Sequence, residues 1–228
     1  MPLIEVVKTP KTTDEALSTA MVTAAALRKN AVITTDTPGF VVNRILAKLL
    51  GEAMNAVENG TAPDVVVEAV RPFGLPMDPF ALLELVGLPI GAHVLHTHHD
   101  AFPERFFQSA ALDELAEYGH LLEKDAKGKV KGYDPKALAI VRKHQVADPK
   151  PLTAEQLRTR VEDGLADEIH RMLQDHVVAA AEDIDLCLIL GAGWPFQMGG
   201  VTPYLDRVGA SERVFGDTFH HPKIVGVA

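Results

Sequence analysis

The sequence has little cysteine and little positive charge. Cys187 is its one cysteine, so no disulfide can form within the chain, and a reducing cytoplasmic setting is expected rather than secretion. Acidic residues outnumber basic ones by 31 to 22, the net charge is −9, and no block of Lys and Arg occurs. The basic patch that a nucleic acid partner requires is therefore missing.

Long apolar runs are missing as well. No stretch approaches the roughly 18 apolar residues that cross a bilayer, so we expect no membrane span. Residues 1–5 have neither the basic start nor the apolar core of a signal peptide. With 47% hydrophobic and 23% charged residues, the composition is ordinary for a globular protein. We expect a soluble cytoplasmic protein.

The first 35 residues predict a strand, a helix and a second strand. Residues 3–7 and 31–35 are short and rich in β-branched side chains, and the segment between them has a helical pattern. A single βαβ unit cannot cover both faces of its sheet or satisfy its edges. The chain is therefore expected to begin inside a larger α/β domain.

The remaining sequence predicts helices. The first is expected to begin at Pro38, after an N-cap at Thr37, and to end at Glu58. Its polar stripe starts at Arg44, and its apolar stripe contains the odd residue Asn43. A long helix is expected after Thr153, which begins a capping-box pattern. Further helices are predicted near residues 61–71, 79–86, 89–100 and 135–145.

Two segments of the helical part are similar to each other. Gly74-Leu75-Pro76 precedes Leu83-Glu84-Leu85-Val86-Gly87, and Gly193-Trp194-Pro195 precedes Leu205-Asp206-Arg207-Val208-Gly209. This pattern indicates an internal duplication of a helical unit. A duplicated unit commonly buries one face against its copy, as subunits do across a two-fold axis.

Three clusters invite a functional interpretation that their details do not favour. Gly191-Ala192-Gly193 resembles a dinucleotide fingerprint, but Phe196 takes the place of the third glycine and Pro195 lacks a backbone N–H, so a tight turn is expected. The carboxylates of residues 182–185 are expected to cap a helix. His220 and His221 are expected at the surface.

A fourth cluster contains four histidines at the end of a predicted helix. His93, His96 and His99 recur at helical spacing, with His98 beside them. Zinc can use such spacing, whereas histidines at a solvated helix end also suit the helix dipole. We favour the second interpretation and assign no metal, and the role of the cluster stays open.

Glu5 and Asn43 do not fit their surroundings. Glu5 lies in an apolar strand on the same face as Leu3 and Val7, so it is either partly buried with a partner or a strand-edge side chain in water. A buried carboxylate can orient a histidine. Asn43 is either a core amide with satisfied hydrogen bonds or a group that faces a ligand.

Three strings of residues resemble L-3-hydroxyacyl-CoA dehydrogenases. They are Leu3-Ile4-Glu5-Val6-Val7-Lys8-Thr9-Pro10, Asp36-Thr37-Pro38-Gly39-Phe40-Val41-Val42-Asn43-Arg44, and Pro76-Met77-Asp78-Pro79-Phe80 with Leu83-Glu84-Leu85-Val86-Gly87-Leu88. The second copy, residues 182–206, is similar to the tandem C-terminal unit of multifunctional fatty-acid oxidation α-subunits. Only residues 119–151 match weakly.

The resemblance implies a mainly α fold with two tandem helical repeats after a βαβ remnant of a Rossmann domain. Residues 1–35 would be the remnant of the NAD-binding domain, residues 36–118 the first repeat and residues 152–228 the second. Residues 119–151, rich in charge, glycine and proline, would be a linker.

The resemblance also implies the reaction. Members oxidise an L-3-hydroxyacyl-CoA to the 3-ketoacyl-CoA with NAD, and a glutamate that matches Glu5 hydrogen-bonds the histidine base. An asparagine that matches Asn43 contacts the reacting substrate oxygen. The implied partners are the acyl-CoA, the NAD-binding and hydratase portions, a thiolase subunit and further copies of the chain.

This sequence departs from the family pattern in two ways. The family's histidine belongs to a His-x-x-Asn-Pro motif that precedes the glutamate, and no such motif precedes Glu5 here. Glu84 replaces the usual aspartate. We therefore expect the C-terminal part of a larger enzyme, inactive alone. The alternatives are a non-catalytic helical docking or dimerisation module and a fragment of a 3-hydroxybutyryl-CoA dehydrogenase.

Overall fold

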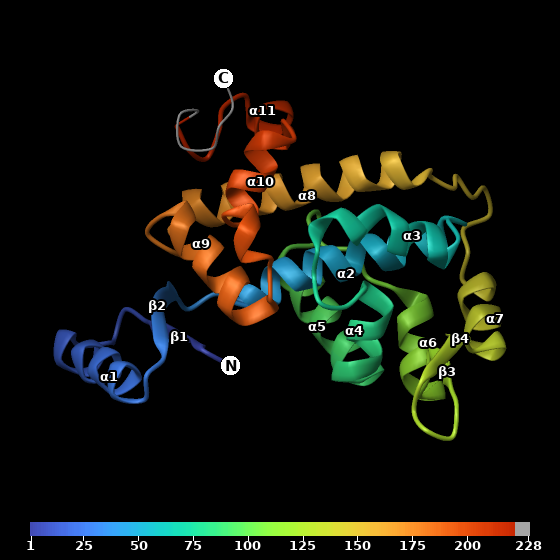
Figure 1. The fold of residues 1–228 in the computed structure, drawn as a ribbon, viewed down its shortest axis with the longest axis horizontal. Coiled ribbons are helices and arrows are strands. Elements are labelled where there is room, and N and C mark those ends of the chain that lie inside the picture. The colour runs from blue at the N-terminus through green and yellow to red at the C-terminus, as the bar shows by residue number, and fades with distance from the viewer. Residues whose placement is uncertain (222–228) are drawn as a thin grey trace. The chain divides into compact units, whose positions relative to one another are not determined.

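The computed structural model describes residues 1–221, and its secondary structure is mainly helical (Figure 1). The strands are β1 Leu3–Lys8, β2 Asn30–Thr35, β3 Leu122–Lys124 and β4 Val130–Tyr133. The first helices are α1 Asp14–Ala26, α2 Val42–Glu58, α3 Pro63–Val70, α4 Pro79–Val86, α5 Leu88–Ala101 and α6 Ala110–Tyr118. The later ones are α7 Pro135–Lys143, α8 Ala154–Gln174, α9 Ala181–Cys187, α10 Val201–Arg207 and α11 Ala210–Phe215. The mainly α fold expected from the sequence is confirmed.

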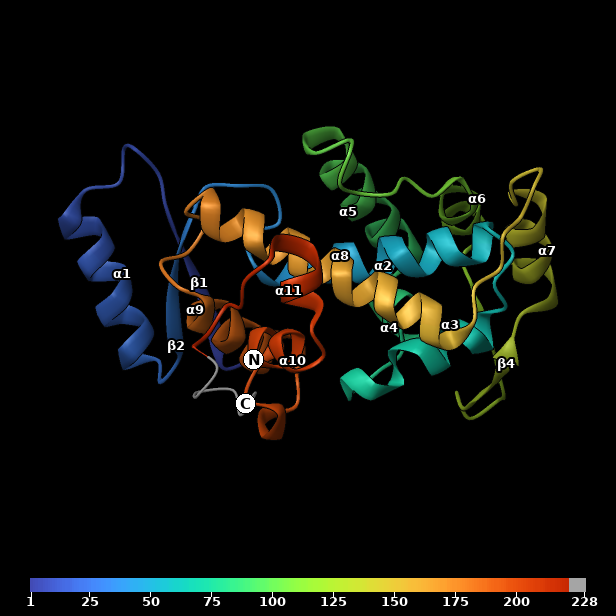
Figure 2. The same ribbon diagram turned by 90° about the horizontal axis from the view of Figure 1, so that it is seen from above.

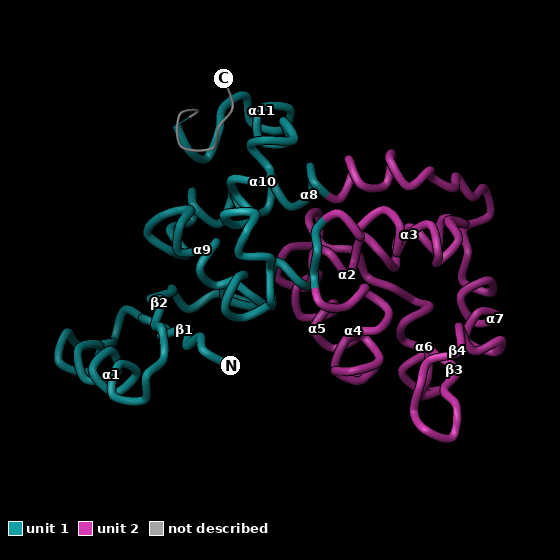
Figure 3. The backbone as a smooth tube through the Cα atoms, viewed as in Figure 1, with its two compact units in different colours: residues 1–46, 73–75, 162–228 teal, residues 47–72, 76–161 magenta. Residues whose placement is uncertain are grey.

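The described chain forms two compact units, neither of which is one continuous stretch (Figure 3). The first contains residues 1–46, 73–75 and the chain from 162 onward, and the second contains residues 47–72 and 76–161. The predicted boundaries at residues 35, 118 and 151 do not correspond to this division by contacts, and as domain boundaries they stay predictions.

The first unit contains the predicted βαβ start. β1 and β2 pair in parallel, with Leu3 opposite Asn30 and Lys8 opposite Thr35. Both views place this two-stranded sheet between α1 and the α9 segment (Figures 1 and 2). Apolar surface of α1 and of the residue that follows it stays exposed: Val22 is 66% exposed and Leu27 is 61% exposed.

The two similar Gly-x-Pro segments meet in the first unit. Phe73 stacks on Trp194 with ring centroids 5.8 Å apart, and both rings contact Tyr204. A Cβ added to Gly74 would lie 2.7 Å from Cγ of Pro195, so the two segments are closely packed. This contact is the packing that a duplicated unit was expected to make.

The second unit consists mainly of helices, and it contains residues 119–151, the segment expected to be a linker. Its buried residues come from several helices and include Leu83, Leu95, Leu112, Leu115 and Leu157. Residues 119–151 contain the β3–β4 hairpin and α7, and Leu121, Ala137 and Val141 of this stretch are buried. The stretch is therefore folded and contributes to the core, although its composition resembles that of a loop.

Several helix ends follow their sequence signals. Asp78 Oδ1 accepts hydrogen bonds from the N–H groups of Phe80 and Ala81 at the start of α4. Thr153 and Gln156 form the reciprocal hydrogen bonds of a capping box before α8. The capping box predicted at Thr153 is confirmed.

The predicted start of α2 at Pro38 is wrong. Residues 38–41 form a turn and the helix begins at Val42. Gly39 and Phe40 have φ values of 75° and 47°, in the left-handed region, which a right-handed helix cannot contain. The extra turn changes the direction of the chain between β2 and α2.

None of the single helices in residues 1–221 has the length and apolarity to cross a bilayer. The α4 and α5 helices pass that test only as a pair, and the pair is bent by 106° at Gly87.

Candidate functional site

The structure brings Glu5 and Asn43 to one place, the N-terminus of α2. Glu5 is the third residue of β1, and its Oε1 accepts a hydrogen bond of 2.8 Å from the N–H of Val41, just before α2. Asn43 is the second residue of that helix. The two residues are 38 positions apart in the sequence, so the β2–α2 turn and this hydrogen bond create the proximity.

Glu5 is partly buried, which decides between the two interpretations of this strand residue. Burial raises the pKa of the Glu5 carboxyl, and the hydrogen bonds from the Val41 and Val42 N–H groups oppose that rise. The carboxylate thus lies at the positive end of the α2 dipole. In the described part of the chain no histidine contacts it.

Asn43 is exposed on the surface of its unit. The alternative of a buried core amide is therefore wrong, because this position of α2 faces outward. Its neighbour Arg44, which begins the predicted polar stripe, is completely buried instead. Helical periodicity placed these two residues on different stripes, but the packing around the helix N-terminus reversed which of them is buried.

Gly191, which belongs to the predicted second repeat, packs against the strand and the helix that hold Glu5 and Asn43. This role was not predicted from the sequence. A Cβ added to Gly191 would lie 2.8 Å from Cγ2 of Val42 and 2.9 Å from Cδ2 of Leu3. Gly191 therefore allows the turn after α9 to approach β1 and α2 closely. The absence of a side chain was visible in the sequence, but its packing role was not.

Cys187 on α9 is buried in the same region. Burial raises the pKa of its thiol to about 12, and the negative charges of Glu5 and Asp183 act in the same direction. A thiol with this pKa stays protonated at neutral pH and is not a nucleophile.

The residues Gly191-Ala192-Gly193 do not fit a bound NAD pyrophosphate. Residues 188–192 form a single π-helical turn that ends at Gly193, with φ 76°. The small size of Gly191 is used for packing against Val42 and Leu3 rather than for the approach of a ligand. These residues therefore give no indication of a phosphate-binding loop.

Three histidines of the cluster have side-chain partners within the protein. Nδ1 of His98 lies 2.7 Å from the Val94 carbonyl oxygen, and Nδ1 of His99 lies 2.8 Å from that of Phe106. Nε2 of His96 lies 2.8 Å from Oδ1 of Asp113. Within residues 1–221 no group of three or more His, Cys, Asp or Glu side chains is arranged to hold a metal ion.

The expectation that His220 lies at the surface is wrong. His220 is buried, and its Nε2 lies 2.7 Å from Oγ1 of Thr202, which donates to Oδ2 of Asp185. Asp206 accepts from the N–H of His220 as well. These groups fasten the chain after α11 to α9 and α10, a tertiary contact that no local pattern signals.

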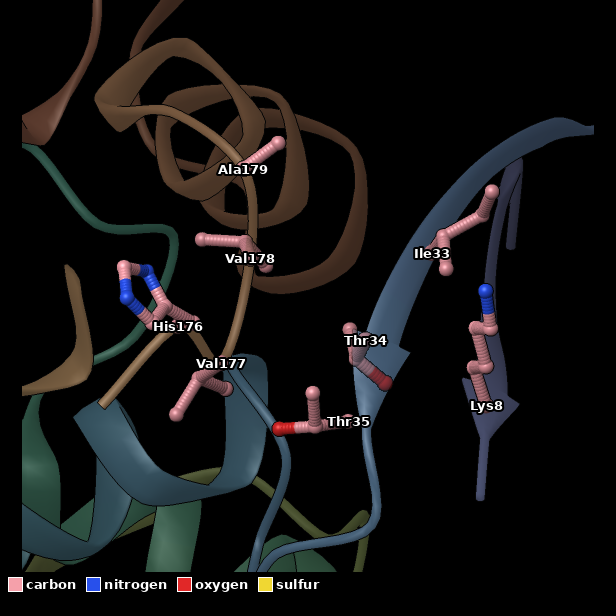
Figure 4. A pocket seen from close by; sticks show the side chains of 8 residues that line it. All are labelled: Lys8, Ile33, Thr34, Thr35, His176, Val177, Val178 and Ala179. Carbon is pink, nitrogen blue, oxygen red and sulfur yellow. The ribbon is translucent and has the colours of Figure 1, made fainter. Parts of the chain in front are cut away.

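A cavity of about 290 Å³ lies at the carboxyl ends of β1 and β2. Lys8, Ile33, Thr34 and Thr35 line one side, and residues 176–179 line the other (Figure 4). The hydroxyl of Thr35 points toward Val177, whose carbonyl accepts from the Thr35 N–H at 2.9 Å. Neither Glu5 nor Asn43 lines this cavity, which is therefore separate from the candidate site.

Residues 39–132 match the family model "3-hydroxyacyl-CoA dehydrogenase, C-terminal domain". The chain is 30% identical over 227 residues to the fatty acid oxidation complex subunit alpha of Acinetobacter baumannii (strain SDF), and the match covers 94% of this chain and 32% of that protein. The corresponding subunit of Pseudomonas syringae pv. tomato is 32% identical over 226 residues, with 94% and 31% covered. The chain thus spans about a third of the length of these curated relatives.

A solved structure has the same fold. The 3-hydroxybutyryl-CoA dehydrogenase from Escherichia coli K12 substr. MG1655 aligns with a TM-score of 0.70 and 19% identity, over 99% of this chain and 67% of that one. The Glu5 and Asn43 roles are not tested by these comparisons and stay predictions. The match of residues 39–132 to this family model confirms the resemblance to 3-hydroxyacyl-CoA dehydrogenases that the sequence motifs indicated.

Proposed function

We propose that this chain works as the C-terminal part of an NAD-dependent L-3-hydroxyacyl-CoA dehydrogenase of fatty-acid oxidation. The observation that carries the proposal is the meeting of Glu5 and Asn43 at the N-terminus of α2. The similarity to fatty acid oxidation α-subunits over nearly the whole chain supports it. NAD would bind outside the described residues.

Glu5 would orient the histidine base. Its carboxylate is fixed by the Val41 N–H, so it can accept a hydrogen bond from one nitrogen of an imidazole ring and select the tautomer whose other nitrogen is free to take a proton. Partial burial strengthens such a contact because the local dielectric is lower than in water. The histidine itself would come from another part of the enzyme.

Asn43 would contact the reacting oxygen of the substrate. Its amide is exposed at the start of α2, close to where Glu5 is held. An amide N–H donor that meets an oxygen on which negative charge develops stabilises the transition state. The helices of the first repeat would supply the surface for the acyl-CoA.

The kinetics of the full-length gene product test both roles. We expect it to reduce NAD with an L-3-hydroxyacyl-CoA, and Glu5→Gln and Asn43→Ala each to lower kcat by about 10²–10³-fold. Glu15→Gln on exposed α1 is the control and should leave the rate unchanged. Unchanged kinetics in Asn43→Ala, with altered assembly or stability, would instead support a docking or dimerisation module.

Substrate range and partners need separate measurements. A rate confined to 3-hydroxybutyryl-CoA, with none for longer chains, would favour the short-chain enzyme over the fatty-acid oxidation enzyme. We further propose a cytoplasmic location, a homo-oligomer and a thiolase subunit as partner. Cell fractionation, light scattering and co-purification from the native source test these three proposals in turn.

A further inference from the structure

The turn between β2 and α2 determines where Glu5 finds its hydrogen-bond donor. Residues 37–41 reverse the chain, and Phe40 adopts a left-handed backbone conformation that is uncommon for a residue with a side chain. Such a conformation persists only where the surrounding structure holds it. The turn ends at Val41, whose N–H binds Glu5.

Arg44 connects this turn to α8. Its guanidinium Nε lies 2.5 Å from Oε1 of Glu168, and its Nη1 donates to Oγ1 of Thr37 at 3.2 Å. The side chains of Arg44 and Glu168 are both completely buried. The N–H of Arg44 also donates to the carbonyl oxygen of Gly39, inside the turn.

The guanidinium group suits this task for geometric reasons. Its planar fork has donors in fixed directions, so one group can hold a carboxylate on α8 and a hydroxyl at the first residue of the turn together. A lysine ammonium would not fix both directions. Because a buried charge without a partner is costly, we expect the Arg44 guanidinium to stay paired with Glu168.

We propose that Arg44, held by Glu168, is a positioning residue: it fixes the turn of residues 37–41, so that the Val41 N–H meets Glu5 and Asn43, the second residue of α2, lies at a set place. The second repeat would thereby contribute to catalysis through α8 without touching the substrate. The catalytic consequence rests on the function proposed above, whereas the effect on the turn does not.

Thr37 allows the sharpest test, because replacing Arg44 or Glu168 leaves a buried charge without its partner. Thr37→Val removes the hydroxyl but keeps the shape, and Thr37→Ser keeps the hydroxyl. The matched control is Thr97→Val, which removes an exposed hydroxyl from α5 that binds the His93 carbonyl.

The first readout is NMR of residues 1–228. In Thr37→Val we expect the Val41 amide resonance to move and the Glu5 carboxyl to titrate at a higher pH, because a weakened hydrogen bond no longer lowers its pKa. Thr37→Ser and Thr97→Val should match the parent chain. A Thr37→Val spectrum that leaves Val41 and Glu5 unchanged would overturn the inference.

The second readout is the kinetics of the full-length gene product. Thr37→Val should lower kcat about tenfold while KM changes less than about threefold, since a small misplacement of reacting groups affects the rate most. Thr37→Ser should restore the rate. Equal rates for Thr37→Val and the parent enzyme would overturn the catalytic role. If no enzyme shows turnover although the NMR signals move, the proposed function fails and the control of the turn stands.

Discussion

At the scale of single residues, the most informative positions are buried or partly buried charged side chains. Arg44 and Glu168 pair in the interior, Glu58 accepts from the Ser109 hydroxyl, and Glu5 caps a helix from a strand. A charge is buried only where a partner compensates for lost hydration. Each of these partners lies at least 36 residues away in the sequence, so none could be read from a local pattern.

Glu84, where the family usually has aspartate, makes a specific structural contact. Its Oε2 accepts from the N–H of Leu121 at 2.9 Å, and its Oε1 pairs with Lys124 at 2.9 Å. Burial by itself raises the pKa of Glu84, but the hydrogen bonds from Lys124, Leu121 and Leu122 outweigh it, and the pKa is lowered. A carboxyl with a lowered pKa stabilises the folded state in its ionised form.

Glu84→Gln should therefore destabilise the protein in a pH-dependent way. We expect a loss of about 1–2 kcal/mol at pH 7, typical of hydrogen bonds to a charged group. The difference from the parent is fully present above the ordinary glutamate pKa of 4.5 and disappears as the pH falls through the lowered folded-state value. Urea unfolding at several pH values measures it, and a difference that grows on acidification would contradict the argument.

At the scale of elements, the two repeats use equivalent acidic residues in the same way. Glu84 of α4 and Asp206 of α10 occupy matching positions before Gly87 and Gly209. Glu84 accepts from the backbone N–H of Leu121, and Asp206 accepts from those of Phe219 and His220. In each repeat a carboxylate fastens the chain that returns after the helices, which supports the predicted duplication.

The glycine before α10 offers a test of local packing. Gly200 has φ 129°, and a Cβ at this position would lie 2.3 Å from Cγ of the buried Asp185. Gly200→Ala should cost more than about 3 kcal/mol, because backbone strain and overpacking add. Gly216→Ala is the control: its φ is 74° with open space around it, so only about 1–2 kcal/mol is expected. Similar melting temperatures for the two variants would contradict this prediction, because they would show that the Asp185 side chain can move to accommodate the added methyl group.

At the scale of the whole molecule, the βαβ start exposes apolar surface. Val22, Leu27 and Ile33 are 66%, 61% and 39% exposed, and the sheet in this unit has two strands. Parallel sheets are generally covered on both faces. The larger α/β domain that the sequence predicts around these residues stays a prediction.

Residues 1–228 by themselves should not catalyse the dehydrogenase reaction. We expect residues 1–228, mixed with NAD and an L-3-hydroxyacyl-CoA, to form no NADH above the background, because the described residues hold neither a phosphate-binding loop nor a histidine at Glu5. Circular dichroism should show a folded helical protein in the same sample. NADH formation that depends on Glu5 would refute the expectation that residues 1–228 are inactive alone.

The sequence alone was sufficient for the class of the fold, several helix ends and the resemblance to the family. Those features depend on short-range patterns: capping at Asp78 and Thr153, helical periodicity, and the string of residues 36–44. It also singled out Glu5 and Asn43, because a charge in an apolar strand and an amide in an apolar stripe are visible locally.

The tertiary structure decided what surrounds these residues. The left-handed turn at Gly39 and Phe40, the burial of Arg44 and His220, and the close approach of Gly191 all depend on segments that meet only after folding. Periodicity reports which face of a helix is apolar on average, but a buried ion pair makes a polar residue part of the core. The proximity of Glu5 and Asn43 is therefore a property of the fold, although each residue was recognisable in the sequence.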